Sequence, residues 1–582
     1  MKKSERFLAL LLSTMILFSG SMITFAAGET SAVNVSVKGI EDEKSLICTN
    51  EEENHDHGEV CYKSLLSVKA YQIITYDERG FYKEVLDDTI SKGDVLTTVD
   101  GKEIQELIPD AENIQTLFRT SLNQFSDVHI CDFEKNEDGS YTPAGDVILS
   151  PGTWMVTVSG SDKYLYNPAI VSVNITPDGI VYGTLNLETD SWAQPGETPL
   201  YLKRDEPQIT KTAESAATVD GRTDPVVTGT QFGDILKFKI EADIPGYMKN
   251  KLNIEYSIED ILTGLTLVKN EQYQPSATIA GATPEDIKAA DTAVKDAVSH
   301  GAAGFIMDSL SSEFLVRNAN KKITIVYFAK VTSTELVNVD QLNNTAKLSY
   351  STNDTDRVRT KEDETKHYTF GFDTSVIGTI GTGTQDKTGE FIKINDKGSV
   401  KYSETNAGEI VKTNELVEYL NDAEFQLHIG SAQGKLFKDK QNKEIFRTDG
   451  SGRLQIVGLD DDTDYFLVET KAPTGYSIRT DPIRIRITAD YDENDDLKGY
   501  SVAIGEKENE QVTHYSYYVV NGKTDVVNTG DTASNPYGFK NTKLAELPST
   551  GGVGTTIFTF GGCMAMVTAA GLYFANCKKN KK

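Results

Sequence analysis

The sequence has no excess of basic residues. Lysine and arginine together number 58 against 87 aspartate and glutamate residues, which gives a formal net charge of −29 and a pI near 4.7. Nucleic acids and anionic lipid surfaces are therefore not expected as partners. The sequence also lacks a Ser/His/Asp nucleophile motif, paired glycosidase carboxylates in a recognisable context and a Gly-rich phosphate loop. A secreted enzyme thus has little support, and no cofactor is expected.

Long apolar runs are confined to the two ends of the chain. At the N-terminus, Lys2, Lys3 and Arg6 precede an apolar run that ends in small residues. This is the pattern of a secretory signal peptide, and we expect residues 1–26 to be removed by cleavage after Ala26. That cut leaves Thr24 and Ala26 at the small-residue positions, so the chain is expected to be exported.

The C-terminal run covers residues 553–577 and is long enough to cross a bilayer, which takes ~20 residues. Four lysines follow it, so the extreme C-terminus is expected to stay cytoplasmic. A plain single-span anchor would explain these features. The segment just before the run, however, resembles the LPxTG sorting signal of Gram-positive surface proteins, with Leu547, Pro548, Ser549, Thr550 and Gly551 in its five positions.

This resemblance implies that a sortase attacks the Thr550 carbonyl, releases the chain from Gly551 onward and passes the acyl group to an amine. The span is then a processing device, and the mature protein is secreted and attached to the peptidoglycan of the cell wall. Sortase and peptidoglycan are the partners implied.

Between the two ends lie roughly 500 residues, for which about three domains are expected. Short alternating segments rich in Val, Ile, Thr and Tyr, separated by turn residues, predict a mainly β protein built of tandem immunoglobulin-like β-sandwich domains. Helical insertions are expected at 101–122 and 283–301, where Pro and acidic residues come early. The predicted domains cover residues 27–200, 205–375 and 386–545, with the sorting signal at 547–582.

A glutamate interrupts an apolar strand of the third domain in YFLVETKAPTGY, residues 465–476. Alternation puts Tyr465, Leu467 and Glu469 on one face, so a core-facing strand would bury the carboxylate. Lys393 lies in the first strand of this domain and Asn541 in the last.

This order resembles that of collagen-adhesin B-type domains, whose YxLxETxAPxGY and LxGAxF patterns match residues 465–476 and 420–425, with Asn421-Asp422 in place of the usual Gly step. The resemblance implies an intramolecular isopeptide bond between Lys393 and Asn541. Apolar burial disfavours the charged forms of lysine and glutamate. A neutral amine can then attack the carboxamide while Glu469 polarises it and shuttles protons.

A second set of such residues is expected in the middle domain. Lys211 comes early, and Asn344 is chosen over Asn343 because alternation places it with Ala346, Leu348 and Tyr350. Asp260 shares a strand face with Tyr256 and Ile258. The segment around it resembles the DxLxxGL stretch of collagen-adhesin A-like pilin domains, where an aspartate takes the role of the glutamate. A coincidental Lys, Asp and Asn is the competing interpretation.

Lys203 lies eight positions before Lys211, at the junction of the first two domains. Shaft pilins carry a lysine in a VYPK-type motif at this junction; in LYLK, Leu202 replaces the proline and Trp192 lies farther upstream than the usual tryptophan. The resemblance implies that Lys203 resolves the sortase acyl-enzyme and joins Thr550 of one subunit to the next. An exposed linker lysine is the alternative.

The few cysteines define one further candidate site. Cys48, His55, His57 and Cys61 lie within one short stretch, which favours a Cys48–Cys61 disulfide over a metal site. Cys131 is left over, while Cys563 and Cys577 lie in the C-terminal run. In the first domain Lys69 and Asn167 are present, but the sequence offers no obvious acid between them.

Taken whole, the chain resembles the backbone subunit of a sortase-assembled pilus, with other pilin subunits as partners. A singly wall-anchored adhesin that binds a host or matrix ligand is the alternative. The DxSxS motif of a metal-dependent tip-adhesin domain does not occur in the sequence.

Overall fold

The computed structural model describes the chain in separate stretches: 37–40, 66–76, 82–84, 130–137, 140–143, 149, 152–161, 164–166, 169–176, 179–186, 191–193, 200–202, 204–219, 221, 227–247, 253–333, 339–351, 358–374, 377–378, 385–386, 389–402, 410–520, 523–528, 536–544 and 553–579. Two compact units emerge. The first comprises residues up to Val227 with Gly233–Thr332 and Leu342–His367, and the second comprises Thr228–Phe232, Ser333–Gln341 and the chain from Tyr368. Strands dominate both units, which confirms the predicted mainly β fold.

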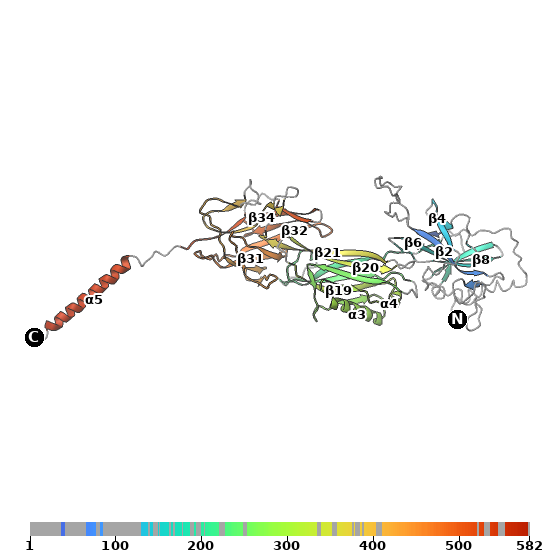
Figure 1. Cartoon of the computed structure of the whole chain (residues 1–582), viewed down its shortest axis with the longest axis horizontal. Helices are drawn as coiled ribbons and strands as arrows, with labels where there is room; N and C mark the ends of the chain where they lie inside the picture. Colours follow the sequence, from blue (N-terminus) through green and yellow to red (C-terminus); the bar gives the residue numbers. More distant parts are fainter. Residues whose placement is uncertain are drawn as a thin grey trace, which may run out of the picture. The chain divides into compact units, whose positions relative to one another are not determined.

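The N-terminal part of the first unit is one antiparallel-rich sheet in the order β10-β9-β8-β6-β2-β4-β5-β1-β11, with β3 paired to β2. Figure 1 labels β2, β4, β6 and β8 of this sheet. Its strands are β1 (Val37–Lys38), β2 (Ser67–Tyr76), β3 (Tyr82–Glu84), β4 (Ile130–Lys135), β5 (Tyr141–Pro143), β6 (Gly152–Ser159), β8 (Ala169–Thr176), β9 (Gly179–Asn186), β10 (Ser191–Ala193) and β11 (Leu200–Tyr201). Their buried side chains, among them Val37, Trp154 and Val171, form a core of their own. A separate pair joins β7 (Leu165–Tyr166) to β12 (Arg204–Asp205).

The rest of the first unit is a two-sheet sandwich. One sheet has the order β13-β14-β19-β16 with β17 also on β19, and the other has the order β18-β15-β20-β21. These strands are β13 (Ile209–Ala217), β14 (Ile235–Asp243), β15 (Tyr256–Thr263), β16 (Leu265–Leu267), β17 (Ser276–Ile279), β18 (Gly304–Met307), β19 (Lys322–Val331), β20 (Val339–Ser351) and β21 (Val358–Phe372). Strict alternation of buried and half-buried residues along β14 shows one face packed against the core and the other facing outward.

Two helices interrupt the sandwich. The longer, α3 (Pro284–His300), begins where Thr283 accepts a hydrogen bond from the backbone N–H of Asp286, and Pro284 occupies the first turn. It packs against β17 and β18 through Ala290, Val294 and neighbouring apolar residues (Figure 1). This confirms the helix expected at 283–301. The shorter α4 (Ser312–Arg317) follows β18. The helix expected at 101–122 lies outside the described residues.

The second unit is organised around an antiparallel sheet in the order β28-β27-β31-β32-β33-β34-β35, with β29 on β27. Its strands are β27 (Glu424–Ile429), β28 (Lys435–Leu436), β29 (Phe446–Arg447), β31 (Asp464–Lys471), β32 (Ile483–Tyr491), β33 (Leu497–Ile504), β34 (Gln511–Val520) and β35 (Lys523–Asn528). Shorter pairs are β22 (Ile377–Gly378) with β23 (Gln385–Asp386), β25 (Val400–Tyr402) with β26 (Ile410–Lys412), and β30 (Ile456–Leu459) with the end of β21.

The first and last strands of the second unit's domain pair with each other in parallel. β24 (Phe391–Asn395) runs beside β36 (Tyr537–Asn541), with Lys393 opposite Phe539 and Asn395 opposite Asn541. All five residues of β24 are buried. The two ends of the domain's sequence are thus neighbours in space, although more than 140 residues separate them.

The turn before β27 explains an irregularity in the sequence pattern. Asp422 stands where the resembling domains have glycine, and its φ is 57°. This left-handed conformation is the one that glycine adopts without steric cost and that aspartate tolerates better than most residues. The turn before β27 therefore has a backbone conformation that glycine favours, at a position where this chain has an aspartate.

The predicted domain boundaries near residues 200 and 375 stay predictions. β11 and β12 both pair with strands of the N-terminal part, on either side of residue 203. The second unit begins its continuous chain at Tyr368, near the expected end of the middle domain.

Candidate functional site

Lys393, Glu469 and Asn541 meet in the interior of the second unit. Lys393 Nζ donates a hydrogen bond to Asn541 Oδ1 and lies 3.2 Å from Glu469 Oε1. Asn541 Nδ2 donates to both carboxylate oxygens of Glu469, at 2.9 and 3.0 Å. The side chains of Lys393 and Glu469 have no exposed surface. Amine, carboxamide and carboxylate are therefore in mutual contact away from water.

Backbone contacts hold two members of this triad, Lys393 and Glu469, in place. Lys393 N donates to Gly452 O at 2.7 Å, and Gly452 has a φ of +73°, where a Cβ would lie 2.5 Å from the Lys393 carbonyl oxygen. Glu469 sits at an inward position of β31 and accepts a hydrogen bond from Arg479 N at 2.7 Å. The close approach at Gly452 admits no side chain without displacing the lysine backbone.

Aromatic rings enclose the lysine. Lys393 Nζ lies 4.2 Å from the centre of the Phe539 ring, which packs edge-on against Phe425 at 5.2 Å. Burial lowers the pKa of Lys393 to about 8, although the neighbouring Glu469 carboxylate acts in the opposite direction. A lysine in this environment is neutral far more often at physiological pH than a lysine in water.

Lys211, Asp260 and Asn344 also meet in the interior of the first unit, where they come from β13, β15 and β20. Lys211 Nζ donates to Asp260 Oδ2, and both side chains are fully enclosed. Asn344 has no exposed surface. It lies on β20, opposite Leu262 of β15, the strand that also carries Asp260. The backbone of Gly304 lies close to that of Asp260, and a Cβ at residue 304 would lie 2.1 Å from the Asp260 carbonyl oxygen.

A residue that the sequence reasoning missed connects this second triad. The hydroxyl of Tyr327, on β19, accepts from Lys211 Nζ at 2.6 Å and from Asn344 Nδ2 at 2.8 Å, and it donates to Asp260 Oδ1 at 2.7 Å. Burial lowers the pKa of Lys211 and raises that of Asp260, while their mutual attraction opposes both shifts. A tyrosine in an alternating apolar strand carries no sequence signal that sets it apart from a core residue.

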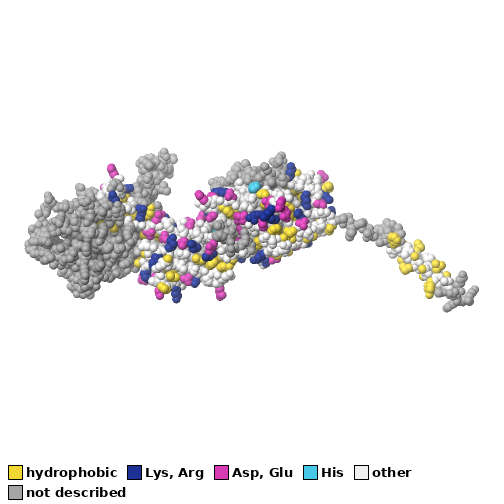
Figure 2. Space-filling model, turned by 180° about the vertical axis from the view of Figure 1, so that it is seen from behind, with side chains coloured by type: hydrophobic (Ala, Val, Ile, Leu, Met, Phe, Trp, Pro, Cys, Tyr) yellow, Lys and Arg dark blue, Asp and Glu magenta, His cyan; other side chains and the backbone are white. Residues whose placement is uncertain are grey.

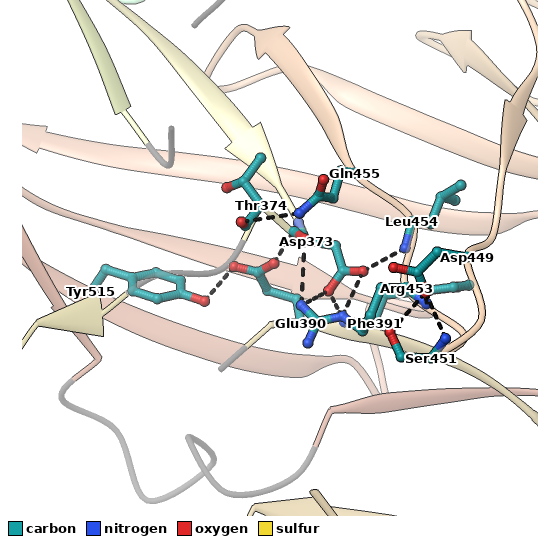
Figure 3. Close-up of polar contacts among 10 residues, drawn as sticks. All are labelled: Asp373, Thr374, Glu390, Phe391, Asp449, Ser451, Arg453, Leu454, Gln455 and Tyr515. Atoms are coloured by element: carbon teal, nitrogen blue, oxygen red, sulfur yellow. Dashed lines mark hydrogen bonds and ion pairs between the residues drawn. The ribbon is translucent and has the colours of Figure 1, made fainter. Parts of the chain in front are cut away.

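A third buried polar cluster, also unforeseen, lies where β21 leads into β24 (Figure 3). Arg453 binds the Asp373 carboxylate through Nη2 and through Nε at 3.0 Å. Asp373 N donates to Glu390 Oε2 at 2.6 Å, and the Tyr515 hydroxyl donates to the other Glu390 oxygen. In Figure 3 the two acids lie side by side between Arg453 and Tyr515. The Asp373 carboxylate thus holds the guanidinium while the Asp373 backbone N–H holds Glu390, and these contacts tie residue 373 to residue 390.

This cluster predicts a pH-dependent stability of the second unit. Burial raises the pKa of Asp373 from 3.8 to about 7, and it raises that of Glu390 as well. Because the folded state then binds more protons than the unfolded state, the stabilisation is fully present below pH ~4 and is lost as the pH rises through 7. Denaturant unfolding at pH 5 and pH 8 should show this loss. Asp373→Asn should reduce it to the part contributed by Glu390, and the exposed control Asp481→Asn should keep it in full. An unchanged pH dependence in Asp373→Asn would contradict the assignment.

The C-terminal helix presents apolar side chains to its surroundings along its length. α5 (Val553–Lys579) contains a span, Phe558–Asn576, with a mean hydropathy of 1.4 and none of it buried. It is the one helix in the described part of the chain that is long and apolar enough to cross a membrane. Figure 2 shows hydrophobic side chains along this helix, whereas acidic and basic side chains are interspersed over the described surface of the domains.

Several predicted site residues lie outside the described residues. They are the sorting signal at 547–551, Lys203, Asn167 and the Cys48–Cys61 stretch with its histidines. Lys69 is described and lies 3.4 Å from Asp132 in an exposed pair. Within the described ranges, no three His, Cys, Asp or Glu side chains are placed to hold a metal ion.

Comparison with known proteins gives two family matches. A SpaA-type prealbumin-like fold domain matches residues 406–501, and the LPXTG cell wall anchor motif matches residues 540–582. The chain is a wall-anchored surface protein. The anchor match covers the predicted sorting signal and α5, so the predicted location on the surface of a Gram-positive cell is confirmed. The domain match includes Glu469 and the strands β27 and β31 that carry the predicted pattern.

A relative and two solved structures are similar to this chain. The surface protein is 23% identical over 463 residues to the trypsin-resistant surface T6 protein of Streptococcus pyogenes serotype M6, covering 72% of this chain and 77% of the relative. It is similar to the structure of the T6 backbone pilin of that species, with 15% identity, 89% and 100% coverage and a TM-score of 0.48. It is also similar to the full-length major pilin SpaD of Corynebacterium diphtheriae, with 16% identity, 88% and 98% coverage and a TM-score of 0.41. The SpaA-type domain, the anchor and the homology to T6 confirm the resemblance predicted from the sequence.

Proposed function

We propose that this protein is the backbone subunit of a covalent, sortase-assembled pilus whose middle and C-terminal domains are each closed by a lysine–asparagine isopeptide bond. The observation that carries the proposal is the buried contact of Lys393, Glu469 and Asn541 across the first and last strands of one domain. A carboxylate, an amine and a carboxamide in dry mutual contact are costly to bury unless they react or pair. The role is structural, and the chemistry serves the chain itself.

The reaction in the second unit needs one acid–base group. A proton moves from Lys393 Nζ to Glu469, which leaves a neutral amine beside a protonated acid. The amine attacks Asn541 Cγ while the acid donates to the carboxamide. The Nζ–Cγ bond forms, and Nζ gives its second proton to Glu469 as the acid passes the first proton to Nδ2. The Cγ–Nδ2 bond breaks, and the nitrogen leaves as ammonium with both of the protons that Nζ lost. Glu469 ends as it began, so it acts once as a catalyst in its own domain.

The position of each bond suits a load-bearing fibre. Joining β24 to β36 carries a pulling force from Lys393 directly to Asn541, so the strands between them bear none of it. Joining Lys211 on β13 to Asn344 on β20 does the same for the middle domain. A chain pulled from its two ends would therefore stay folded between the linked residues.

Assembly would use the sorting signal at one end and a lysine near the other. Sortase would form an acyl-enzyme at Thr550, and Lys203 of the next subunit would resolve it. The final subunit would be passed to peptidoglycan. Residue 203 lies between β11 and β12, both of which pair with strands of the N-terminal part, so the surrounding chain is fixed.

The assembly proposal is tested on cell-wall extracts of a host that expresses the protein with its sortase. The wild-type chain should give a ladder of covalent multimers on denaturing gels. Lys203→Ala should give monomers, while Lys295→Ala, which removes an exposed helix lysine, should keep the ladder. A single band from the wild-type chain would favour the singly anchored adhesin instead. A ladder that survives Lys203→Ala would place the acceptor lysine elsewhere.

A further inference from the structure

The two triads differ in how the acid reaches the asparagine. In the second unit Glu469 contacts Asn541 directly, through both oxygens. Asp260 is one methylene shorter, and the hydrogen bonds recorded for its carboxylate run to Lys211 and Tyr327. Asn344 Nδ2 instead bonds to the Tyr327 hydroxyl at 2.8 Å. The described contacts of the first unit contain no direct bond between the acid and the amide that it would have to activate.

We propose that Tyr327 is a catalytic residue of the middle domain, whose hydroxyl relays a proton between Asp260 and the departing nitrogen of Asn344. This inference rests on the proposed isopeptide bond between Lys211 and Asn344. The hydroxyl touches all three partners, at 2.6 Å from the attacking nitrogen, 2.7 Å from the acid and 2.8 Å from the leaving nitrogen. The hydroxyl thus connects the shorter acid, Asp260, to the amide nitrogen of Asn344.

The relay balances without any added reagent. Lys211 first gives one proton to Asp260, and its neutral Nζ attacks Asn344 Cγ. As the Cγ–Nδ2 bond breaks, the Tyr327 hydroxyl donates its proton to Nδ2 and takes one back from Asp260. Nζ also loses a second proton, which passes to Asp260 after Asp260 has given the first one to Tyr327. The nitrogen of the new amide bond keeps a single hydrogen. Tyrosine and ammonia are both neutral at the end, and the hydroxyl is regenerated.

The surroundings hold the hydroxyl in place for this role. Tyr327 has no exposed surface, stacks on Phe238 with ring centres 5.4 Å apart, and meets Phe305 edge-on at 5.0 Å. Its strand β19 is interior to the sheet and pairs with β14 on one side and with β16 and β17 on the other. Burial raises the pKa of Tyr327 well above its usual value, so the hydroxyl keeps the proton that a relay must donate.

The test is a time course of bond formation in the secreted chain, residues 27–546, made by cell-free synthesis and quenched in denaturant. Digestion and mass measurement would quantify the Lys211–Asn344 cross-linked peptide and the loss of ammonia. Tyr327→Phe should slow this bond by roughly 10²-fold or more, the range expected for removing a positioned proton-transfer group. The Lys393–Asn541 bond in the same molecule should form at the wild-type rate, which reports that the second unit has folded and that synthesis and quenching were equal.

Two further variants separate catalysis from packing. Tyr256→Phe removes another buried hydroxyl of this core, one that bonds to Asp243 O, and should leave the rate unchanged. Adding Asp260→Glu to Tyr327→Phe lengthens the acid and should restore part of the rate, an effect that a packing role would not produce. A wild-type rate in Tyr327→Phe would overturn the relay and leave the proposed function intact. Absence of the Lys211 cross-link from the wild-type chain would overturn both the middle-domain bond and the relay.

Discussion

Glu469→Gln is expected to leave Lys393 and Asn541 unjoined. The amide has nearly the shape of the carboxylate, but it can neither take the proton from Lys393 Nζ nor return it to the departing nitrogen. Removing a positioned general acid–base group slows such steps ~10²–10⁴-fold. The Lys393–Asn541 cross-linked peptide should therefore be missing from digests of freshly made protein, and the variant should lack one ammonia molecule fewer than wild type when each mass is compared with that of its own sequence.

A matched control and a second bond sharpen this prediction. Glu508→Gln changes an exposed glutamate of the same unit and should leave the cross-link complete. The Lys211–Asn344 bond should form in both variants because it lies in the first unit. A complete Lys393–Asn541 bond in Glu469→Gln would show that the contact between acid and asparagine has no part in the chemistry.

Loss of the same bond is expected to weaken the second unit strongly against heat and force. The bond closes a loop between residues 148 positions apart. The chain-entropy model for cross-links credits such a closure with about 5 kcal/mol, which corresponds to a fall in melting temperature of about 10–20 °C for a domain of this size. The double variant Lys393→Met/Glu469→Gln removes the bond without leaving a buried unpaired charge, so it isolates this contribution.

Single-molecule pulling gives the larger contrast. The wild-type domain should not extend between Lys393 and Asn541, whereas the double variant should unfold and release about 500 Å of chain, at 3.3–3.6 Å for each of the 148 residues. Asp481→Asn serves as a linked control with wild-type extension. Equal extension and equal melting temperatures in wild type and double variant would contradict a covalent closure.

Period-2 alternation was enough to place the acids and one asparagine of the triads. It put Glu469 on the face of Tyr465 and Leu467, and it separated Asp260 from Glu259 and Asn344 from Asn343, as the burial along β15, β20 and β31 now shows. These choices depend only on the alternation of side chains along a single strand, which can be read from neighbouring residues in the sequence. The start of α3 was equally readable, because Thr283, Pro284 and the acidic residues after them are capping signals in consecutive positions.

The residues that were not predicted owe their roles to contacts between strands that meet across the core. Tyr327 differs from an ordinary core tyrosine only because β19 carries its hydroxyl to the strands of Lys211, Asp260 and Asn344. Arg453 reaches Asp373 from 80 positions away in the sequence. Such encounters are set by tertiary pairing, for which a single sequence has no local signal.

The most direct test of the account is the intact denatured mass of the secreted chain from Ala27 to Glu546. The measured mass should lie below that of the sequence by two ammonia molecules, and by one ammonia molecule in Lys393→Ala and in Lys211→Ala. A deficit of one that disappears only with Lys393→Ala would contradict the bond in the middle domain. A mass equal to that of the sequence would contradict both bonds, and with them the load-bearing role proposed for the protein.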